Sequence, residues 1–236
     1  MIELAKSINI VDSPISALQE IDQLVNSPSV TNISFLNAHG CIIASKNSDF
    51  NSALLNSDYL FRDGIGVKMM LKSLSSPSGY NANGTDLIPL VLKRHKEKKI
   101  LCIGTSTPFL DKAVRKMRES GINIVHAIDG FRSKEDMVQV IEQYKPDIVL
   151  LGMGMPRQEL FCDHFKSLNY NSSIMFICGG AILDFYAERF PRAPNLFRKF
   201  GLEWFYRLIK EPKRLFKRYV LGIPMFFLLL MSLERK

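Results

Sequence analysis

Short apolar runs alternate regularly with segments of helical periodicity over residues 99–178. Apolar runs separated by helices of this length form right-handed βαβ units, and such units build a parallel sheet. The sequence therefore predicts an α/β fold, a Rossmann-like parallel sheet flanked by helices. The expected strands span residues 99–103, 122–126, 147–151 and 173–178, and the expected helices span 108–120, 133–144 and 156–168.

The first hundred residues continue this pattern less regularly. Residues 14–25, 65–71 and 84–96 have helical spacing, whereas 33–36 and 59–61 are short apolar runs typical of strands. A segment rich in Ser, Pro, Gly and Asn, residues 73–83, indicates a loop. With 236 residues, the chain suits one α/β core, expected at 1–190, followed by a C-terminal appendage at 191–236.

The segment 147–162 predicts a buried strand, a glycine turn and a helix. Gly152 and Gly154 end the apolar run, and Pro156 can begin a helix because the first helical turn does not need its N–H. Helix N-termini at the carboxyl ends of parallel strands attract phosphates, so Gln158 and Glu159 are expected at a binding edge. A Gly-x-Gly pair is equally compatible with an ordinary strand-to-helix turn.

Several classes of protein are disfavoured by motifs that the sequence lacks. It has no Gly-x-Gly-x-x-Gly with a following acidic residue and no Walker motif, which disfavours dehydrogenases and ATPases. The four cysteines have no paired spacing, so we expect neither a disulfide framework nor a metal site, and Cys102 and Cys178 are expected as small buried hydrophobes. We expect no cofactor. Residues 1–10 lack a basic start and a long apolar stretch, which predicts a cytosolic chain.

The net charge of +8 is concentrated in one segment. Residues 189–218 hold ten Lys or Arg and two acidic residues, so the rest of the chain is neutral overall. A nucleic-acid-binding protein would more often spread its charge over a recognition surface, and this partner is therefore disfavoured.

An uncharged run of about fifteen residues, 219–233, directly follows the basic segment. It is shorter than the roughly 20 residues that cross a bilayer, and it contains Gly222 and Pro224. A basic, aromatic-rich helix beside a short apolar run suits the interface of an anionic membrane. The alternative is a C-terminal helix that packs on its own domain or on a partner subunit.

Several short stretches of the chain are informative when they are taken together. They are Arg62-Asp63-Gly64-Ile65-Gly66, Gly84-Thr85-Asp86-Leu87, residues 152–159 (GMGMPRQE), Arg192-Ala193-Pro194, residues 201–207 (GLEWFYR) and Glu211-Pro212-Lys213-Arg214. Through these stretches the chain resembles the bacterial WecG/TagA/CpsF glycosyltransferase family over nearly its whole length. Each stretch is weak alone, but their order and spacing make the resemblance specific.

The resemblance implies transfer of a sugar from a UDP-sugar to a polyprenyl-pyrophosphate-linked saccharide, with inversion and without a metal ion. It further implies peripheral attachment to the inner, cytoplasmic face of the cell membrane. The products of the family are cell-surface polysaccharides, and the usual donor carries N-acetylmannosamine or its uronic acid. Homo-oligomers are also compatible with the sequence.

Individual roles also follow from the resemblance. Asp63 matches the proposed catalytic base, Gln158 the glutamine of the Pro-Lys/Arg-Gln-Glu motif, and Asn37 an asparagine of the first strand-end loop. A carboxylate near the acceptor hydroxyl can take its proton during displacement at the anomeric carbon. The expected donor-binding residues are Asn37, Gly84, Asp86, Gly152, Gly154 and Gln158.

Arg207, Arg214 and Arg218 match arginines of the family's C-terminal appendage. A guanidinium group binds phosphate oxygens in pairs and stays charged, so these residues are expected at the acceptor diphosphate. A solvated basic helix face or contact with lipid head groups would produce the same pattern.

Some residues depart from the family pattern. Many members have an arginine three residues before the Gly84 position, where this chain has Asn81, and the usual Gly-Val-Gly before Asp184 is Cys178-Gly179-Gly180. Another donor, such as UDP-glucose, therefore stays open. A non-catalytic nucleotide-sugar-binding or assembly protein of a membrane polysaccharide complex is the alternative from a different class.

Overall fold

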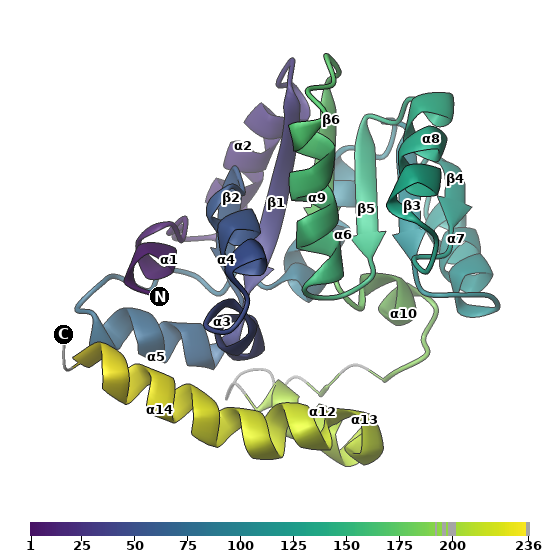
Figure 1. Cartoon of the computed structure of the whole chain (residues 1–236). Coiled ribbons are helices and arrows are strands. Elements are labelled where there is room, and N and C mark those ends of the chain that lie inside the picture. Colours follow the sequence, from purple (N-terminus) through teal and green to yellow (C-terminus); the bar gives the residue numbers. More distant parts are fainter. Residues whose placement is uncertain (192, 195–196, 198–201, 235–236) are drawn as a thin grey trace.

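The fold is built around one six-stranded, fully parallel sheet (Figure 1). The computed structural model describes residues 1–191, 193–194, 197 and 202–234, and of Arg214, Lys217 and Glu234 it describes the backbone alone. The order of the strands is β2-β1-β6-β5-β3-β4. Their bounds are β1 Val30–Leu36, β2 Tyr59–Arg62, β3 Ile100–Gly104, β4 Ile124–Ile128, β5 Ile148–Gly152 and β6 Ile174–Cys178. The predicted α/β Rossmann-like class is confirmed.

Helices cover both faces of the sheet. On one face lie α2 (Pro14–Val25), α6 (Gly84–Arg94), α7 (Phe109–Glu119) and α10 (Ile182–Tyr186), which pack with alternate strand residues such as Ile148 and Leu150. The intervening residues, Val149 and Leu151, face α8 (Lys134–Tyr144) and α9 (Arg157–Ser167) on the other side. Strands buried on both faces explain why the sequence shows continuous apolar runs rather than alternation.

A third apolar cluster extends the core beyond the strands. It joins β2 to α1 (Ile2–Lys6), α3 (Ala38–Ala44), α4 (Ser48–Leu55), α5 (Ile65–Ser73) and α14 (Gly222–Glu234). The helices α1, α3, α4 and α10 are absent from the sequence-based expectation. Strand β4 also begins two residues later than expected, because Ile122 and Asn123 close the turn after α7.

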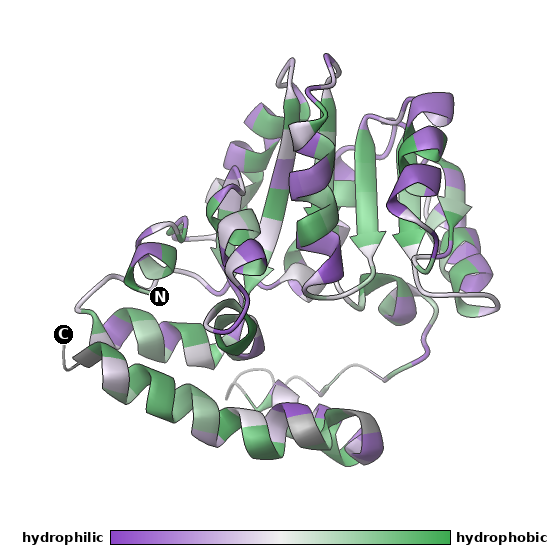
Figure 2. Ribbon diagram, viewed as in Figure 1, coloured by the Kyte–Doolittle hydropathy of each residue, from purple (hydrophilic) through white to green (hydrophobic). Residues whose placement is uncertain are grey.

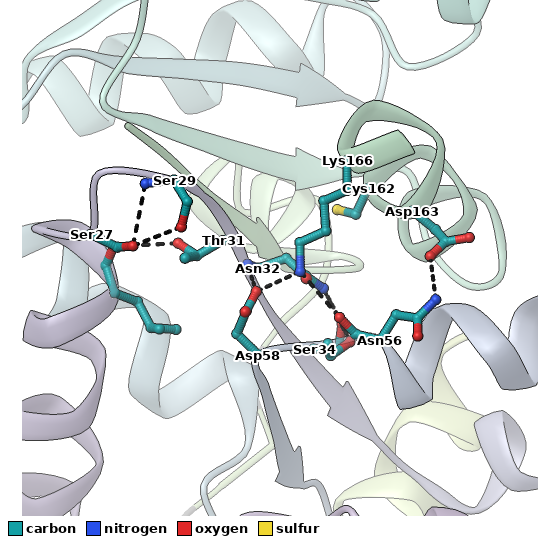
Figure 3. Close-up of polar contacts among 12 residues, drawn as sticks. Ser27, Ser29, Thr31, Asn32, Ser34, Asn56, Asp58, Cys162, Asp163 and Lys166 are labelled. Carbon is teal, nitrogen blue, oxygen red and sulfur yellow. Dashed lines mark hydrogen bonds and ion pairs between the residues drawn. The ribbon is translucent and has the colours of Figure 1, made fainter. Parts of the chain in front are cut away.

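One face of β1 carries buried polar side chains instead of apolar ones. The side chains of Asn32 and Ser34 are buried there. The carboxylate of Asp58 accepts a hydrogen bond from the backbone N–H of Asn32 (2.8 Å) and forms an ion pair with Lys166 of α9 (Figure 3). These contacts fix β1 against α9, and β1 ends and α9 begins at the same edge of the sheet.

The C-terminal part of the chain lies across the carboxyl ends of the strands (Figure 1). It consists of α12 (Glu203–Lys210), α13 (Pro212–Phe216), the π-helical turn η1 (Lys217–Leu221) and α14. Phe226, Leu230 and Leu233 of α14 are buried against α3 and α5. Among the described residues, no helix is both long and apolar enough to cross a membrane.

The opposite side of this C-terminal part exposes large apolar side chains. Figure 2 shows hydrophobic residues along most of α14. The exposed ones in the C-terminal helices are Phe205, Ile209, Phe216, Val220, Leu221, Phe227, Leu228 and Met231. The two sequence-based alternatives for this run are therefore not exclusive, since one side of α14 packs on the core and another stays uncovered.

Candidate active site

Two cavities meet at the carboxyl edge of the sheet. The first, of about 250 Å³, lies over the glycine turns that follow β5 and β6. The second, of about 360 Å³, lies between α3, α5 and the C-terminal helices, and its walls include Trp204, Tyr219 and Phe226. We call them the polar cavity and the apolar cavity. Six residues line both: Asn37, His39, Asp63, Thr85, Arg207 and Arg218.

Asp63 lies at this junction because β2 ends beside β1. Leu36 and Arg62 are register partners at the ends of the two strands, and the backbone N–H of Asp63 donates to the carbonyl of Leu36 (2.8 Å). Burial raises the pKa of the Asp63 carboxyl above its ordinary value. A hydrogen bond from Asn37 and the charges of Arg218, Arg207 and Arg62 partly offset this rise. The net direction is a raised pKa, which brings a carboxylate closer to the range suited to a general base.

Asn37 has two roles that fix its side-chain amide. Its Oδ1 accepts a hydrogen bond from the N–H of Gly40 (3.0 Å), which caps the N-terminus of α3. Its Nδ2 donates to Oδ2 of Asp63 (3.5 Å). The helix cap therefore orients the amide so that its donor group points to Asp63.

The turn after β5 forms part of the polar cavity. Gly152, Gly154 and Gln158 line it, as expected. Oε1 of the buried Gln158 accepts hydrogen bonds from the N–H groups of Gly154 (3.2 Å) and Gly180 (3.0 Å). Gln158 thus ties together the turns after β5 and β6, and in this form those two N–H groups do not point at the cavity as phosphate donors.

Glu159 is buried beside Gln158 and does not line either cavity. Its Oε1 accepts a hydrogen bond from Nε2 of Gln158 (2.8 Å), while Oε2 has no hydrogen-bond partner in the described part of the chain. Burial raises the pKa of this carboxyl to about 7. Glu159 therefore orients the Gln158 amide and does not face a ligand in either cavity.

Gly84 lines the polar cavity, and a Cβ atom at this position would lie only 3.3 Å from the ring of Phe35. Asp86 is not among the lining residues. Its N–H donates to Oδ1 of Asn83 (3.0 Å) and its carboxylate accepts from Nδ2 of Asn83 (2.8 Å), which is the N-terminal cap of α6. The donor-binding role of Asp86 stays a prediction from the resemblance.

Two of the three expected arginines reach the junction. Arg207 and Arg218 come from α12 and η1, and Arg207 also lies 5.1 Å above the ring of Phe185. The backbone of Arg214 belongs to α13, but its side chain lies outside the described part, as do the whole residues Arg192 and Gly201 of the matching stretches. The junction therefore presents two described guanidinium groups to an anion.

His39 and Thr85 are junction residues that the sequence analysis did not assign. Burial, followed by the charge of Arg218, lowers the pKa of His39 to about 4, so its imidazole is neutral at physiological pH. Their positions could have indicated them, since each residue lies in the first turn of a helix that begins at the carboxyl edge of the sheet. No group of three or more His, Cys, Asp or Glu side chains suited to a metal ion occurs within the described ranges.

Comparisons with known proteins identify the family of the chain. Residues 6–236 match the model of the Glycosyl transferase WecG/TagA/CpsF family. Three relatives share the name N-acetylglucosaminyldiphosphoundecaprenol N-acetyl-beta-D-mannosaminyltransferase. The Bacillus subtilis strain 168 protein is 30% identical over 86% of this chain and 80% of its own length.

The other two relatives have a slightly lower identity to this chain. The Bacillus spizizenii strain W23 protein is 28% identical over 81% of this chain and 75% of its own length. The Staphylococcus aureus strain MW2 protein is 26% identical over 93% of this chain and 87% of its own length. The chain belongs to the WecG/TagA/CpsF family and is a glycosyltransferase.

Proposed function

We propose that this protein is an inverting, metal-independent glycosyltransferase that moves a sugar from a UDP-sugar to a polyprenyl-pyrophosphate-linked saccharide in cell-surface polysaccharide synthesis. One observation carries the proposal. Asp63 stands on the wall common to a polar cavity, suited to a nucleotide-sugar, and an apolar cavity, suited to a lipid-linked acceptor. A base between donor and acceptor is what direct displacement at the anomeric carbon needs.

The donor would occupy the polar cavity. Its floor consists of strand-end turns with glycines at 84, 152 and 154, which let a ligand approach the backbone. Open parallel sheets bind ligands at this edge. The guanidinium groups of Arg207 and Arg218 lie at the same wall and would meet phosphate oxygens. Their fixed charges would stabilise the negative charge that develops on the leaving UDP.

The acceptor would enter through the apolar cavity with its sugar hydroxyl at Asp63. The carboxylate takes the hydroxyl proton while the oxygen forms a bond to the anomeric carbon. The bond between that carbon and the phosphate oxygen breaks on the opposite side, and UDP leaves with the electron pair. One displacement inverts the configuration of the anomeric carbon. The names of the relatives favour N-acetylglucosaminyl diphosphate polyprenol as the acceptor class and an N-acetylmannosamine donor.

The uncovered apolar residues of the C-terminal helices support attachment to an anionic membrane. Leu228 is 67% exposed, and Phe216 and Leu221 are also more than half exposed. The basic residues Lys210 and Lys213 lie exposed in the same part of the chain. Apolar side chains inserted at the head-group level, with lysines nearby, bind anionic lipid. We place the protein as a peripheral protein on the cytoplasmic face, with residues 191–236 as its membrane-binding appendage.

A panel of UDP-sugars, assayed with a lipid-linked N-acetylglucosaminyl diphosphate acceptor in detergent or vesicles, tests the proposed reaction. Released UDP and the mass of the lipid product are the readouts. We expect one donor to yield a product that is heavier by one sugar residue, in the presence of EDTA. If a UDP-sugar binds but the acceptor mass never changes, the protein is instead a nucleotide-sugar-binding component of a polysaccharide complex.

A further inference from the structure

The turn that carries Asp63 is held from both sides by two side chains, those of Arg62, which precedes Asp63, and of Asn81, from the loop 74–83. Gly64 has φ 90° and ψ 177°, a conformation that a residue with a side chain rarely adopts. Its N–H donates a hydrogen bond to Oδ1 of Asn81 (2.7 Å), and its carbonyl accepts one from Nη1 of Arg62 (3.2 Å). Both polar backbone groups of the residue that follows Asp63 are therefore fixed.

Arg62 is an unusual residue for the last position of a strand, because it is charged and only 5% exposed. Its Nη2 donates to the carbonyl of Gly79 (3.0 Å), and Nε has no hydrogen-bond partner within the described residues. Burying a guanidinium is costly unless its contacts compensate, and burial does lower the pKa of Arg62. Arg62 thus connects the Asp63–Gly64 turn to the loop 74–83.

Asn81 belongs to the same loop, three residues before Gly84. The loop is fixed to the core by a hydrogen bond from the N–H of Tyr80 to the carbonyl of Val11 (2.6 Å). The side chain of Asn81 accepts the hydrogen bond from the N–H of Gly64. On the other side of the turn, the guanidinium of Arg62, the last residue of β2, donates to the carbonyl of Gly64.

We propose that Arg62 and Asn81 are positioning residues of the transfer reaction, which together hold the Asp63–Gly64 turn so that the Asp63 carboxylate stays at the junction of the two cavities. This inference rests on the proposed function of Asp63 as the base. Neither residue needs to touch the donor. A displacement of about 1 Å in a reacting group can lower a rate by about a hundredfold, so a clamp on the turn has a large effect on catalysis.

Arg62 has an electrostatic effect beyond its hydrogen bonds. The groups that face Asp63 are Arg62 from β2, Asn37 and the neutral His39 from the start of α3, Arg207 from α12 and Arg218 from η1. The positive charge of Arg62 lowers the pKa of Asp63. Removing this charge raises that pKa, and the acidic limb of the activity profile then moves to higher pH, because a protonated carboxyl cannot act as a base.

Four variants of the full-length protein separate position from charge. Asn81→Ala removes the acceptor for Gly64, and Asn81→Asp retains an acceptor but adds negative charge. Arg62→Met removes the charge, and Arg62→Lys keeps it without the paired hydrogen bonds. Ser73→Ala is the matched control, since the Ser73 hydroxyl donates a hydrogen bond to the Met70 carbonyl, away from the turn. The measurements are kcat and KM for the UDP-sugar from pH 5 to pH 9, with melting temperature as a check on folding.

We expect Asn81→Ala and Arg62→Met to lower kcat by roughly tenfold to a hundredfold with KM within about twofold of wild type. Asn81→Asp should recover most of kcat at high pH, with the acidic limb of its kcat–pH profile shifted to higher pH. Arg62→Lys should have its acidic limb at the same pH as the wild-type protein. Wild-type kcat and pH profiles in Asn81→Ala and Arg62→Met would overturn the inference. So would losses of activity that follow the melting temperature without any shift of the limb.

The wild-type protein and Ser73→Ala separate this inference from the proposed function. If neither transfers sugar to the lipid-linked acceptor, the proposed function is wrong, and the inference falls with it. If both transfer sugar and Asn81→Ala and Arg62→Met do so equally well, the reaction is assigned correctly and only the positioning roles are wrong.

Discussion

The side-chain amide of Asn37 donates a hydrogen bond to the carboxylate of Asp63, with Nδ2 and Oδ2 3.5 Å apart, although the two residues are separated by 26 positions in the chain. They meet because each follows the last residue of a strand, and these strands, β1 and β2, are parallel neighbours. The hydrogen bond favours the charged form of the carboxyl and lowers its pKa. Asn37 therefore supports Asp63 as a base as well as capping α3.

Asn37→Ser tests this relationship without removing the helix cap. Serine is a good N-cap residue, but its shorter side chain has no amide to donate to Asp63. We expect the pKa of Asp63 to rise, so the acidic limb of transfer activity should move to higher pH while the melting temperature changes little. The pH dependence of kcat/KM measures this shift. A profile that overlays that of the wild-type protein would mean that the contact has no catalytic effect.

The sheet was predictable from sequence because its strands are buried on both faces. The run Ile148 to Leu151 is continuous and apolar, and Gly152 marks its end. The small helices α3 and α4 were not predicted. Each begins after an asparagine cap, Asn37 or Asn47, and is too short to repeat a helical pattern.

Part of the candidate site could be predicted from the strand ends, and two of its lining residues, Arg207 and Arg218, from the family resemblance. Asp63, Gln158 and Asn37 all follow strand ends or begin helices, which sequence can indicate. The contact of Arg62 with Gly79 was not predictable, because it depends on how the loop 74–83 lies against the end of β2. No local pattern encodes a contact of that kind.

Glu159 should make stability depend on pH. Its pKa is about 7 in the folded protein and about 4.5 as an isolated side chain, so the folded state binds the proton more tightly. The stability from this group is complete below about pH 4.5 and is lost as the pH rises through 7. Replacing the carboxyl with a neutral amide removes that dependence.

The measurement is the difference in unfolding free energy between Glu159→Gln and wild type at pH 5 and pH 8. We expect this difference to change by roughly 2 to 3 kcal/mol in favour of the variant at the higher pH. Glu119→Gln, at an exposed position of α7, is the control and should show no such change. A pH-independent difference for Glu159→Gln would mean that this carboxyl is ionised throughout.

Substitutions at two nearby positions of α14 should affect different properties, one the stability of the fold and the other membrane binding. Phe226 is 3% exposed and packs with α3 and α5, whereas Leu228 is 67% exposed. Phe226→Ala should cost about 3 to 5 kcal/mol of stability, because it leaves a cavity in the core. Leu228→Glu should leave stability within about 0.5 kcal/mol of wild type but weaken binding to anionic lipid vesicles. Co-sedimentation with vesicles and chemical unfolding measure the two effects, and undiminished vesicle binding by Leu228→Glu would contradict membrane attachment through this side of α14.

The most direct test of the proposed function is Asp63→Asn, which removes the base while retaining the shape of the side chain. Binding of the UDP-sugar should stay within about twofold of wild type, since the donor's phosphates would meet arginines rather than Asp63. UDP release in the presence of the lipid-linked acceptor should fall by about 10² to 10⁴-fold, the usual contribution of general base catalysis. Turnover of Asp63→Asn equal to that of the wild-type protein would contradict the assignment of Asp63 as the base.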